Sequence, residues 1–153
     1  MANEPKDQHE TLGAWAKRYH HANRALIESV LRPYDLGSTQ WYVLYQLANA
    51  GPTMQRDLAQ MLHIERATLS GVVATLVRKG LVDQVADSAD QRQRILRITA
   101  SGRTLWDALP DPIAVIEAVS LDGINDTDLE TAIRVLRTAT ERVTNHLADT
   151  ETA

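Results

Sequence analysis

Arginine residues are concentrated in the middle third of this sequence. Residues 64–103 hold seven basic and four acidic residues, a local excess of three positive charges in a chain whose formal net charge is −4. Phosphate groups respond mainly to nearby charge, so an acidic chain with one basic segment can still bind nucleic acid through that segment. The chemistry that this segment favours is ionic and hydrogen-bonding contact with a phosphate backbone.

A helix is predicted from about residue 65 to residue 79, with one apolar side and one small, polar side. Leu69, Val72 and Leu76 recur at helical spacing, and Gly80 suits a left-handed residue at the helix end. The opposite side combines small residues with hydrogen-bonding groups, as a helix that enters a DNA major groove requires. The contacts expected from this helix and the short helix before it are Gln55, Arg66, Ala67, Thr68, Ser70, Thr75 and Arg78.

A basic hairpin is predicted directly after this helix. Residues 81–85 and 95–98 are β-like runs, and the polar stretch ADSADQRQR separates them. Asp90, Arg92 and Arg94 lie near its tip, where arginine suits insertion into a narrow, negative minor groove. A solvated charged turn is the alternative for these arginines. Two short helices followed by such a hairpin predict a winged helix-turn-helix.

Two helices precede this central segment. The first is expected over residues 12–31, with Pro33 ending it, because the residue before a proline avoids helical angles. The second is expected from residue 39 to residue 50 with Ser38 as N-cap, and Thr53 is expected to cap the short helix that follows.

Two further helices are expected after the hairpin. One begins at Thr99 and is interrupted by Pro110 and Pro112, and the other begins with Asn125 as its cap. The predicted fold is therefore mainly α with a small β-hairpin wing. A winged helix-turn-helix domain at 36–103 is flanked by N- and C-terminal dimerisation helices at 10–34 and 104–148, with disordered ends at 1–9 and 149–153.

The stretch ADQRQRILRITASG resembles the wing signature of the MarR (multiple antibiotic resistance regulator) family. In that pattern Asp, any residue and Arg precede a strand that ends in Ile-Thr and is followed by Gly. The residues that match it here are Asp90, Arg92, Ile98, Thr99 and Gly102. LGSTQWYVLYQL resembles the second helix of the family, and LVRKGLV resembles the end of its recognition helix. The motifs are specific from about residue 36 to residue 102, and the element order agrees over residues 10–147.

This resemblance implies a homodimeric regulator that binds a palindromic operator on double-stranded DNA and is usually released by a small ligand. It also implies that Arg92 enters the minor groove and that Asp90 braces it through an ion pair. Gly71 departs from the family pattern, because many relatives have a large or basic residue there. One base contact is therefore expected to be missing.

The first and last helices are the predicted dimer interface, because both have long apolar stripes outside the DNA-binding segment. In the last helix the apolar stripe runs from Leu129 to Leu147, and Thr140 occupies the one polar position within it. The positions have the spacing of a short coiled-coil seam. Packing of this helix against the first helix within one subunit is the alternative. The expected dimerisation residues are Leu12, Leu26, Leu129, Ile133, Leu136, Val143 and Leu147.

Four aromatic residues are expected to line an effector cavity between the first two helices. They are Trp15, Tyr19, Trp41 and Tyr45, and His20, Arg18 or Arg24 is expected to meet an anionic group of the ligand. Ordinary core packing explains the same four aromatics.

Several other functions are not favoured. The chain has no cysteine, which excludes disulfides and thiol chemistry, and no nucleophile lies in a recognisable catalytic motif. No enzyme activity, cofactor or metal is therefore expected, although zinc sensing by His20 or His21 is an open alternative. No apolar run is long enough for a membrane span and no signal peptide is evident, so a cytoplasmic location is expected. A winged helix used for protein contacts is the second alternative, but it would not need an arginine-bearing wing.

Overall fold

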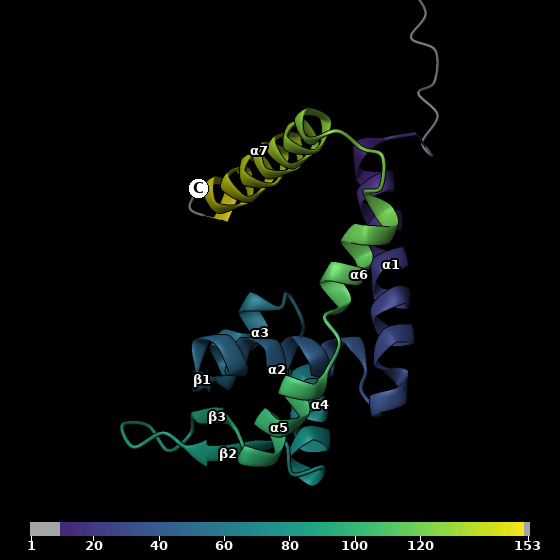
Figure 1. Ribbon diagram of the computed structural model, residues 1–153. Helices are drawn as coiled ribbons and strands as arrows, with labels where there is room; N and C mark the ends of the chain where they lie inside the picture. The colour runs from purple at the N-terminus through teal and green to yellow at the C-terminus, as the bar shows by residue number, and fades with distance from the viewer. Residues whose placement is uncertain (1–9, 152–153) are drawn as a thin grey trace, which may run out of the picture. The chain divides into compact units, whose positions relative to one another are not determined.

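The computed structural model describes residues 10–151 and confirms the mainly helical fold with a small β-sheet (Figure 1). It separates into two compact units, which meet in the sequence between Ile116 and Glu117. The elements in chain order are α1 (Leu12–Leu31), η1 (Arg32–Tyr34), α2 (Ser38–Ala50), β1 (Thr53–Met54), α3 (Gln55–Met61), α4 (Arg66–Arg78), β2 (Val82–Ala86), β3 (Arg94–Ile98), α5 (Ala100–Ala108), α6 (Pro112–Ser120) and α7 (Asp126–Glu151).

Helix α2 lies at the centre of the first unit. Its residues Val43, Leu44 and Leu47 are fully buried, as the apolar character of the helix on most sides predicts. The core around it is built by apolar side chains from the surrounding helices and from the sheet. These include Ile27, Leu31, Leu58, Leu69, Val73, Leu76, Val82 and Leu96.

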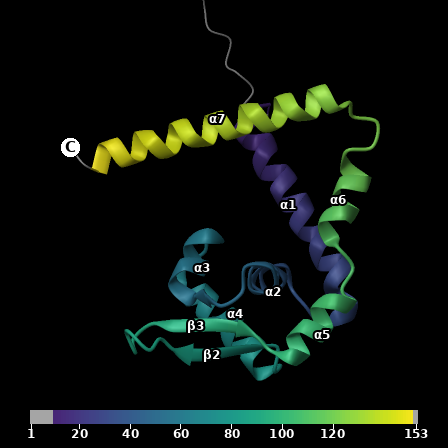
Figure 2. The same cartoon turned by 60° about the vertical axis from the view of Figure 1, so that its left-hand side comes forward.

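The sheet has three antiparallel strands in the order β1-β3-β2. Strands β2 and β3 form the predicted hairpin, in the register Val82 opposite Ile98 and Ala86 opposite Arg94, and its loop extends beyond the helices of this unit (Figure 2). The third strand was not predicted. Thr53 pairs with Leu96 in β1 instead of capping α3, and its hydroxyl donates to the carbonyl oxygen of Gly51. A two-residue strand is too short to leave an alternating pattern in the sequence.

Most helix ends agree with the predictions to within about one residue, the end of α7 excepted. Ser38 is the first residue of α2 and not its cap, which is Gly37, and the Ser38 hydroxyl instead donates to the carboxylate of Glu28 on α1 (3.2 Å). Gly80 has the expected left-handed φ of 72°. The hydroxyl of Thr99 accepts from the main-chain N–H of Gly102 (2.9 Å) and caps α5, and Asn125 caps α7 through Asp128 in the same way.

The two prolines separate α5 from α6, as predicted. Asp111 caps α6, since its carboxylate Oδ1 accepts from the N–H groups of Ile113 and Ala114 (2.9 and 3.3 Å). Pro112 then occupies the first helical position, where its missing N–H costs nothing.

The second unit, described as residues 117–151, consists mainly of α7, and none of the residues of this helix is buried. The helix continues to Glu151, so the expectation of a disordered tail from residue 149 is wrong for residues 149–151. A polar sequence does not prevent helix formation, and Thr150 donates back to the carbonyl of His146 in this last turn (2.7 Å). The predicted disorder at 1–9 and 152–153 lies outside the described residues.

Candidate DNA-binding surface

Helix α4 has the two sides that its sequence predicts. Leu69, Val73 and Leu76 are buried against α2 and α3, which fixes the orientation of the helix. The outer side is exposed, and its first two turns carry hydrogen-bonding groups beside small residues. The exposed residues of this side are Arg66, Ala67, Thr68, Ser70, Gly71 and Ala74. A cationic and hydrogen-bonding face with little steric bulk fits a DNA major groove.

Three side chains join α3, α4 and β2 on the outer side of α4. The amide of Gln84 donates to Oε1 of Gln55 (2.6 Å), and the amide of Gln55 donates to the hydroxyl oxygen of Ser70 (3.2 Å). Gln55 and Ser70 were both predicted as DNA contacts, and the structure brings them together. Gln84 was not predicted, because only the tertiary fold brings β2 beside α3.

Thr75 and Arg78 interact with each other in the last turns of α4. The half-buried Thr75 donates its hydroxyl hydrogen to the carbonyl of Gly71 (3.1 Å), and its oxygen accepts from the guanidinium of Arg78 (3.1 Å). Both side chains were expected to contact DNA. In this structure Arg78 remains exposed, whereas the hydroxyl of Thr75 is used within the helix.

The wing loop places Asp90, Arg92 and Arg94 at an exposed tip, but its internal contacts differ from the expected ones. Asp90 accepts a hydrogen bond from the main-chain N–H of Arg92 (3.0 Å), and within residues 10–151 no ion pair joins the two side chains. Arg94 instead braces the loop, since its guanidinium donates to the carbonyl of Gln91 (2.8 Å). A carboxylate two residues before an N–H forms an Asx turn locally, and this contact uses the main chain of Arg92 and not its guanidinium.

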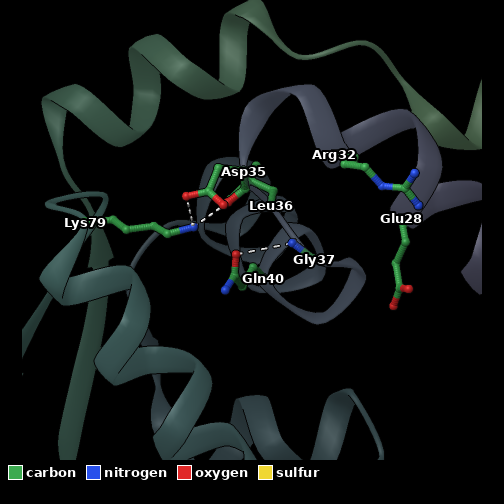
Figure 3. A pocket seen from close by; sticks show the side chains of 7 residues that line it. All are labelled: Glu28, Arg32, Asp35, Leu36, Gly37, Gln40 and Lys79. Carbon is green, nitrogen blue, oxygen red and sulfur yellow. Dashed lines mark hydrogen bonds and ion pairs between the residues drawn. The ribbon is translucent and has the colours of Figure 1, made fainter.

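The C-terminal end of α4 is tied to the junction of α1 and α2. Lys79, the C-cap of α4, forms an ion pair with the carboxylate of Asp35 (3.2 Å) and also donates to the main-chain carbonyl of Asp35. These two residues line a cavity of about 320 Å³ together with Glu28 of α1 and Arg32 of η1. Figure 3 shows the Lys79 side chain directed at Asp35, with Arg32 and Glu28 farther from Lys79. The ion pair is mostly solvated on the Asp35 side, so it positions the helix more than it stabilises the fold.

Thr99 and Gly102 connect the wing to α5. The hydroxyl of Thr99 donates to the carbonyl of Gly80 (2.6 Å), at the end of α4. A Cβ on Gly102 would lie 2.1 Å from the carbonyl oxygen of Leu81, so only glycine permits this approach. The Ile-Thr and Gly of the wing motif are therefore explained by packing at the base of the wing.

Known proteins share both the sequence of this surface and its fold. The sequence profile of the MarR family matches residues 34–93, from the end of η1 into the wing. The HTH-type transcriptional repressor NicR of Pseudomonas putida is 27% identical over 137 residues, which cover 90% of this chain and 87% of NicR. Over this segment the sequence is similar to that of MarR-family regulators. The structure has the winged-helix fold of these proteins.

Solved structures support the MarR fold over nearly the whole chain. The PcaV transcriptional regulator of Streptomyces coelicolor, solved in complex with its natural ligand, is 26% identical and has a TM-score of 0.73. The match covers 92% of this chain and 98% of PcaV. BpsR of Bordetella bronchiseptica, whose DNA binding is regulated by 6-hydroxynicotinic acid, is 24% identical with a TM-score of 0.78, and the match covers 89% of this chain and 97% of BpsR.

The structure does not bring the predicted effector residues together in one cavity. Trp15 and Tyr19 are exposed on α1, where the Trp15 indole donates to Glu10 (3.1 Å) and the Arg18 guanidinium lies 4.8 Å from the Trp15 ring centre. The buried residues of α1, Ile27 and Leu31, lie in its C-terminal half. Trp15 and Tyr19 do not line the cavity that contains Trp41 and Tyr45.

Trp41 and Tyr45 contact an aromatic residue of α5 instead. The ring centre of Trp106 lies 5.8 Å from that of Trp41 and 6.0 Å from that of Tyr45. No spacing in the sequence connects Trp106 with α2, so sequence reasoning missed it. His20 lies in a different cavity, beside Arg24 and Tyr42.

Two further findings concern other classes of site. Within residues 10–151 no three His, Cys, Asp or Glu side chains are grouped closely enough to hold a metal ion. No helix of the described chain combines the length and apolar character that a bilayer crossing requires.

The predicted dimerisation residues are in two different environments. Leu26 packs partly against the hydrophobic core, whereas Leu12 is half-exposed on α1. The stripe on α7 is solvent-accessible along its length in the single chain, with Ile133, Leu136, Val143 and Leu147 all exposed and Leu129 half-buried.

Proposed function

We propose that this protein is a cytoplasmic, homodimeric repressor that binds a palindromic operator on double-stranded DNA and is released by a small aromatic anion. The observation that carries the proposal is the exposed, small and polar outer side of α4, continued by the exposed Arg92 of the wing. Ser70 and Thr68 would contact base edges in the major groove, while Arg92 would enter the adjacent minor groove. The resemblance to a transcriptional repressor of Pseudomonas putida supports repression as the mode of action.

The apolar stripe of α7 supports the homodimer. Val143 is 62% exposed and Leu147 58%, and a stripe of this kind on a long helix requires a partner surface. A second copy offers an identical stripe with coiled-coil spacing. Two-fold pairing would also present two recognition helices, which is the reason to expect an operator with two inverted half-sites.

A cavity of about 350 Å³ between α1, α2 and the helix-turn-helix supports the ligand response. Its lining combines the cationic or ionisable Arg24, His20 and His63 with the apolar side chains of Leu62 and Ile64. This combination suits a planar ring that carries a carboxylate. The remaining lining residues are Ser38, Thr39, Tyr42 and Met61.

The position of this cavity explains how a ligand would release DNA. His63 and Ile64 belong to the turn between α3 and α4, and Arg66 begins the recognition helix two residues later. His63 has a positive φ of 52°, a left-handed conformation that few residues other than glycine adopt, so the shape of the turn depends on this residue. A ligand that moves this turn would move the first turn of α4, which carries the predicted base contacts.

The experiment that tests DNA recognition is the selection of bound duplexes from a random pool by the purified protein. The expected product is an inverted repeat with half-sites about one helical turn (~10 bp) apart. Sequences without two-fold symmetry would contradict the dimeric mode, and a failure to enrich any sequence at low salt would contradict DNA recognition itself.

The dimer is tested by a matched pair of substitutions on α7. Val143→Glu places a charge in the stripe and should halve the mass measured by sedimentation. Asn145→Glu places the same charge on the opposite side of the helix and should leave the mass unchanged. An equal sedimentation mass for the two variants would show that the stripe is not part of the dimer interface.

The ligand response is tested with the selected operator and 6-hydroxynicotinic acid, the regulator of the related BpsR. Other aromatic carboxylates should then be compared. Arg24→Ala should retain operator binding and lose release by the ligand, whereas Arg32→Ala, outside this cavity, should retain both. Release that is unchanged in Arg24→Ala would place the anion elsewhere.

A further inference from the structure

We propose that a second cavity, between α2 and the connection from α5 to α6, binds small organic cations. Its volume is about 390 Å³, large enough for an aromatic or alkyl ammonium compound. Its lining consists of three aromatic rings, two carboxylates, one amide and two apolar side chains. The residues are Trp41, Tyr45, Trp106, Asp107, Asp111, Asn49, Leu109 and Pro110.

The aromatic wall is made by Trp41 and Tyr45 of α2 and Trp106 of α5. The rings of Trp41 and Tyr45 are 5.3 Å apart with an interplanar angle of 37°, and Trp106 is inclined to Trp41 by 35° and to Tyr45 by 72°. Trp41 is almost fully buried, which holds the cluster in place, while Tyr45 is 47% exposed. Indole and phenol rings attract a cation through their electron-rich faces, and tryptophan does so most strongly.

The rim of this cavity is anionic. Asp107 is exposed, and Asp111 uses Oδ1 to cap α6, while its Oδ2 accepts no hydrogen bond within residues 10–151. None of the eight lining residues is basic. A cation held against the aromatic wall would therefore meet negative charge at the rim, which strengthens its attraction.

The ligand chemistry of this cavity is the opposite of that of the cavity at the helix-turn-helix. That cavity is lined by Arg24, His20 and His63, whereas this one is lined by Asp107 and Asp111. The two cavities share no lining residue, although Tyr42 of the first and Trp41 of the second are neighbours on α2. The second site therefore does not depend on the proposed anionic effector.

An organic cation fits this lining better than a metal ion does. Magnesium and calcium require several oxygen ligands in a close shell, but most of this wall is aromatic or aliphatic. A quaternary ammonium group is weakly hydrated and has apolar substituents, so it can contact the rings without losing strong water ligands.

The probe is (4-hydroxyphenyl)trimethylammonium, compared with its neutral isostere 4-tert-butylphenol. The protein is the full chain with Trp15→Phe, because Trp15 lies outside the cavity and the remaining tryptophans, Trp41 and Trp106, both line it. Tryptophan emission should change saturably with the cation, and the neutral compound should bind about tenfold more weakly. No saturable change up to ~10 mM cation, or equal affinity for both compounds, would overturn the proposal.

Charge and ring variants locate the site. Asp107→Asn should weaken binding of the cation about threefold to tenfold, while Asp83→Asn, an exposed carboxylate on β2, should leave it unchanged. Trp106→Leu should weaken it about tenfold and Trp106→Phe should restore most of it. If circular dichroism shows that Trp106→Leu does not fold, the comparison of Asp107→Asn with Asp83→Asn still tests the proposal. Equal effects of Asp107→Asn and Asp83→Asn would place the cation elsewhere.

Discussion

The side-chain amide of Gln55 donates a hydrogen bond of 3.2 Å to the hydroxyl oxygen of Ser70. Gln55 in turn accepts from the amide of Gln84 (2.6 Å), so strand β2 of the wing is connected through α3 to the recognition helix. Because the Ser70 oxygen already accepts this bond, its hydroxyl hydrogen is available to donate to an acceptor on DNA. The three residues therefore orient one polar group on the outer side of α4.

Replacing Thr68 and Ser70 together by alanine should relax operator preference more than it weakens non-specific binding. Base contacts specify sequence, whereas phosphate contacts mainly position the protein. The ratio of specific to non-specific affinity should fall roughly tenfold in competition titrations at fixed salt. Thr127→Ala, at an exposed position on α7, is the control. An equal fall in both affinities would identify the hydroxyls as phosphate contacts.

Arg92→Ala should weaken operator binding by about 1–3 kcal/mol without changing fold or oligomeric state. The guanidinium is exposed at the wing tip, and the main-chain N–H of Arg92, which makes the contact with Asp90, remains after the substitution. The slope of log affinity against log salt should also decrease by about 1 if the arginine neutralises one phosphate. Lys17→Ala on α1 removes one positive charge elsewhere and serves as control. Operator affinity unchanged from that of the original protein would exclude Arg92 from the interface.

Gly71→Ala should stabilise the protein by about 0.5–1 kcal/mol. The added Cβ would meet no atom within 4 Å, so the substitution gains helix propensity without a clash inside the chain. Thermal unfolding should show a melting temperature about 2–4 °C higher, measured at equal protomer concentration. A lower melting temperature would show that the open space beside Gly71 is filled in the assembled protein.

Gly102→Ala should do the opposite and destabilise the protein by roughly 1–3 kcal/mol or more. Its Cβ would be placed 2.1 Å from the carbonyl oxygen of Leu81, and main-chain atoms cannot move aside as a flexible side chain can. Urea unfolding at the same protomer concentration measures the effect, with Gly71→Ala as the matched glycine substitution. Equal midpoints for Gly102→Ala and the original protein would mean that α5 shifts without cost.

The sequence by itself determined the order and type of most elements, because the signals for them are local. The stripe of Leu69 and Leu76, the glycine after α4 and the caps at Thr99 and Asn125 each act within a few residues. The same local signals located the polar side of α4 and the arginines of the wing. The helical end of α7 was missed, because polar residues also continue a helix when their propensity permits it.

Only the tertiary structure decided which distant side chains meet. Strand β1, the bridge from Gln84 to Ser70 and the contact of Trp106 with Trp41 all join segments whose proximity depends on how the helices pack around α2. The spacing of apolar residues along the sequence indicates which face of a helix or strand is apolar. It does not indicate which neighbouring element covers that face. For this reason the aromatic residues of α1 and α2, which look alike in the sequence, are solvated in one helix and packed against α5 in the other.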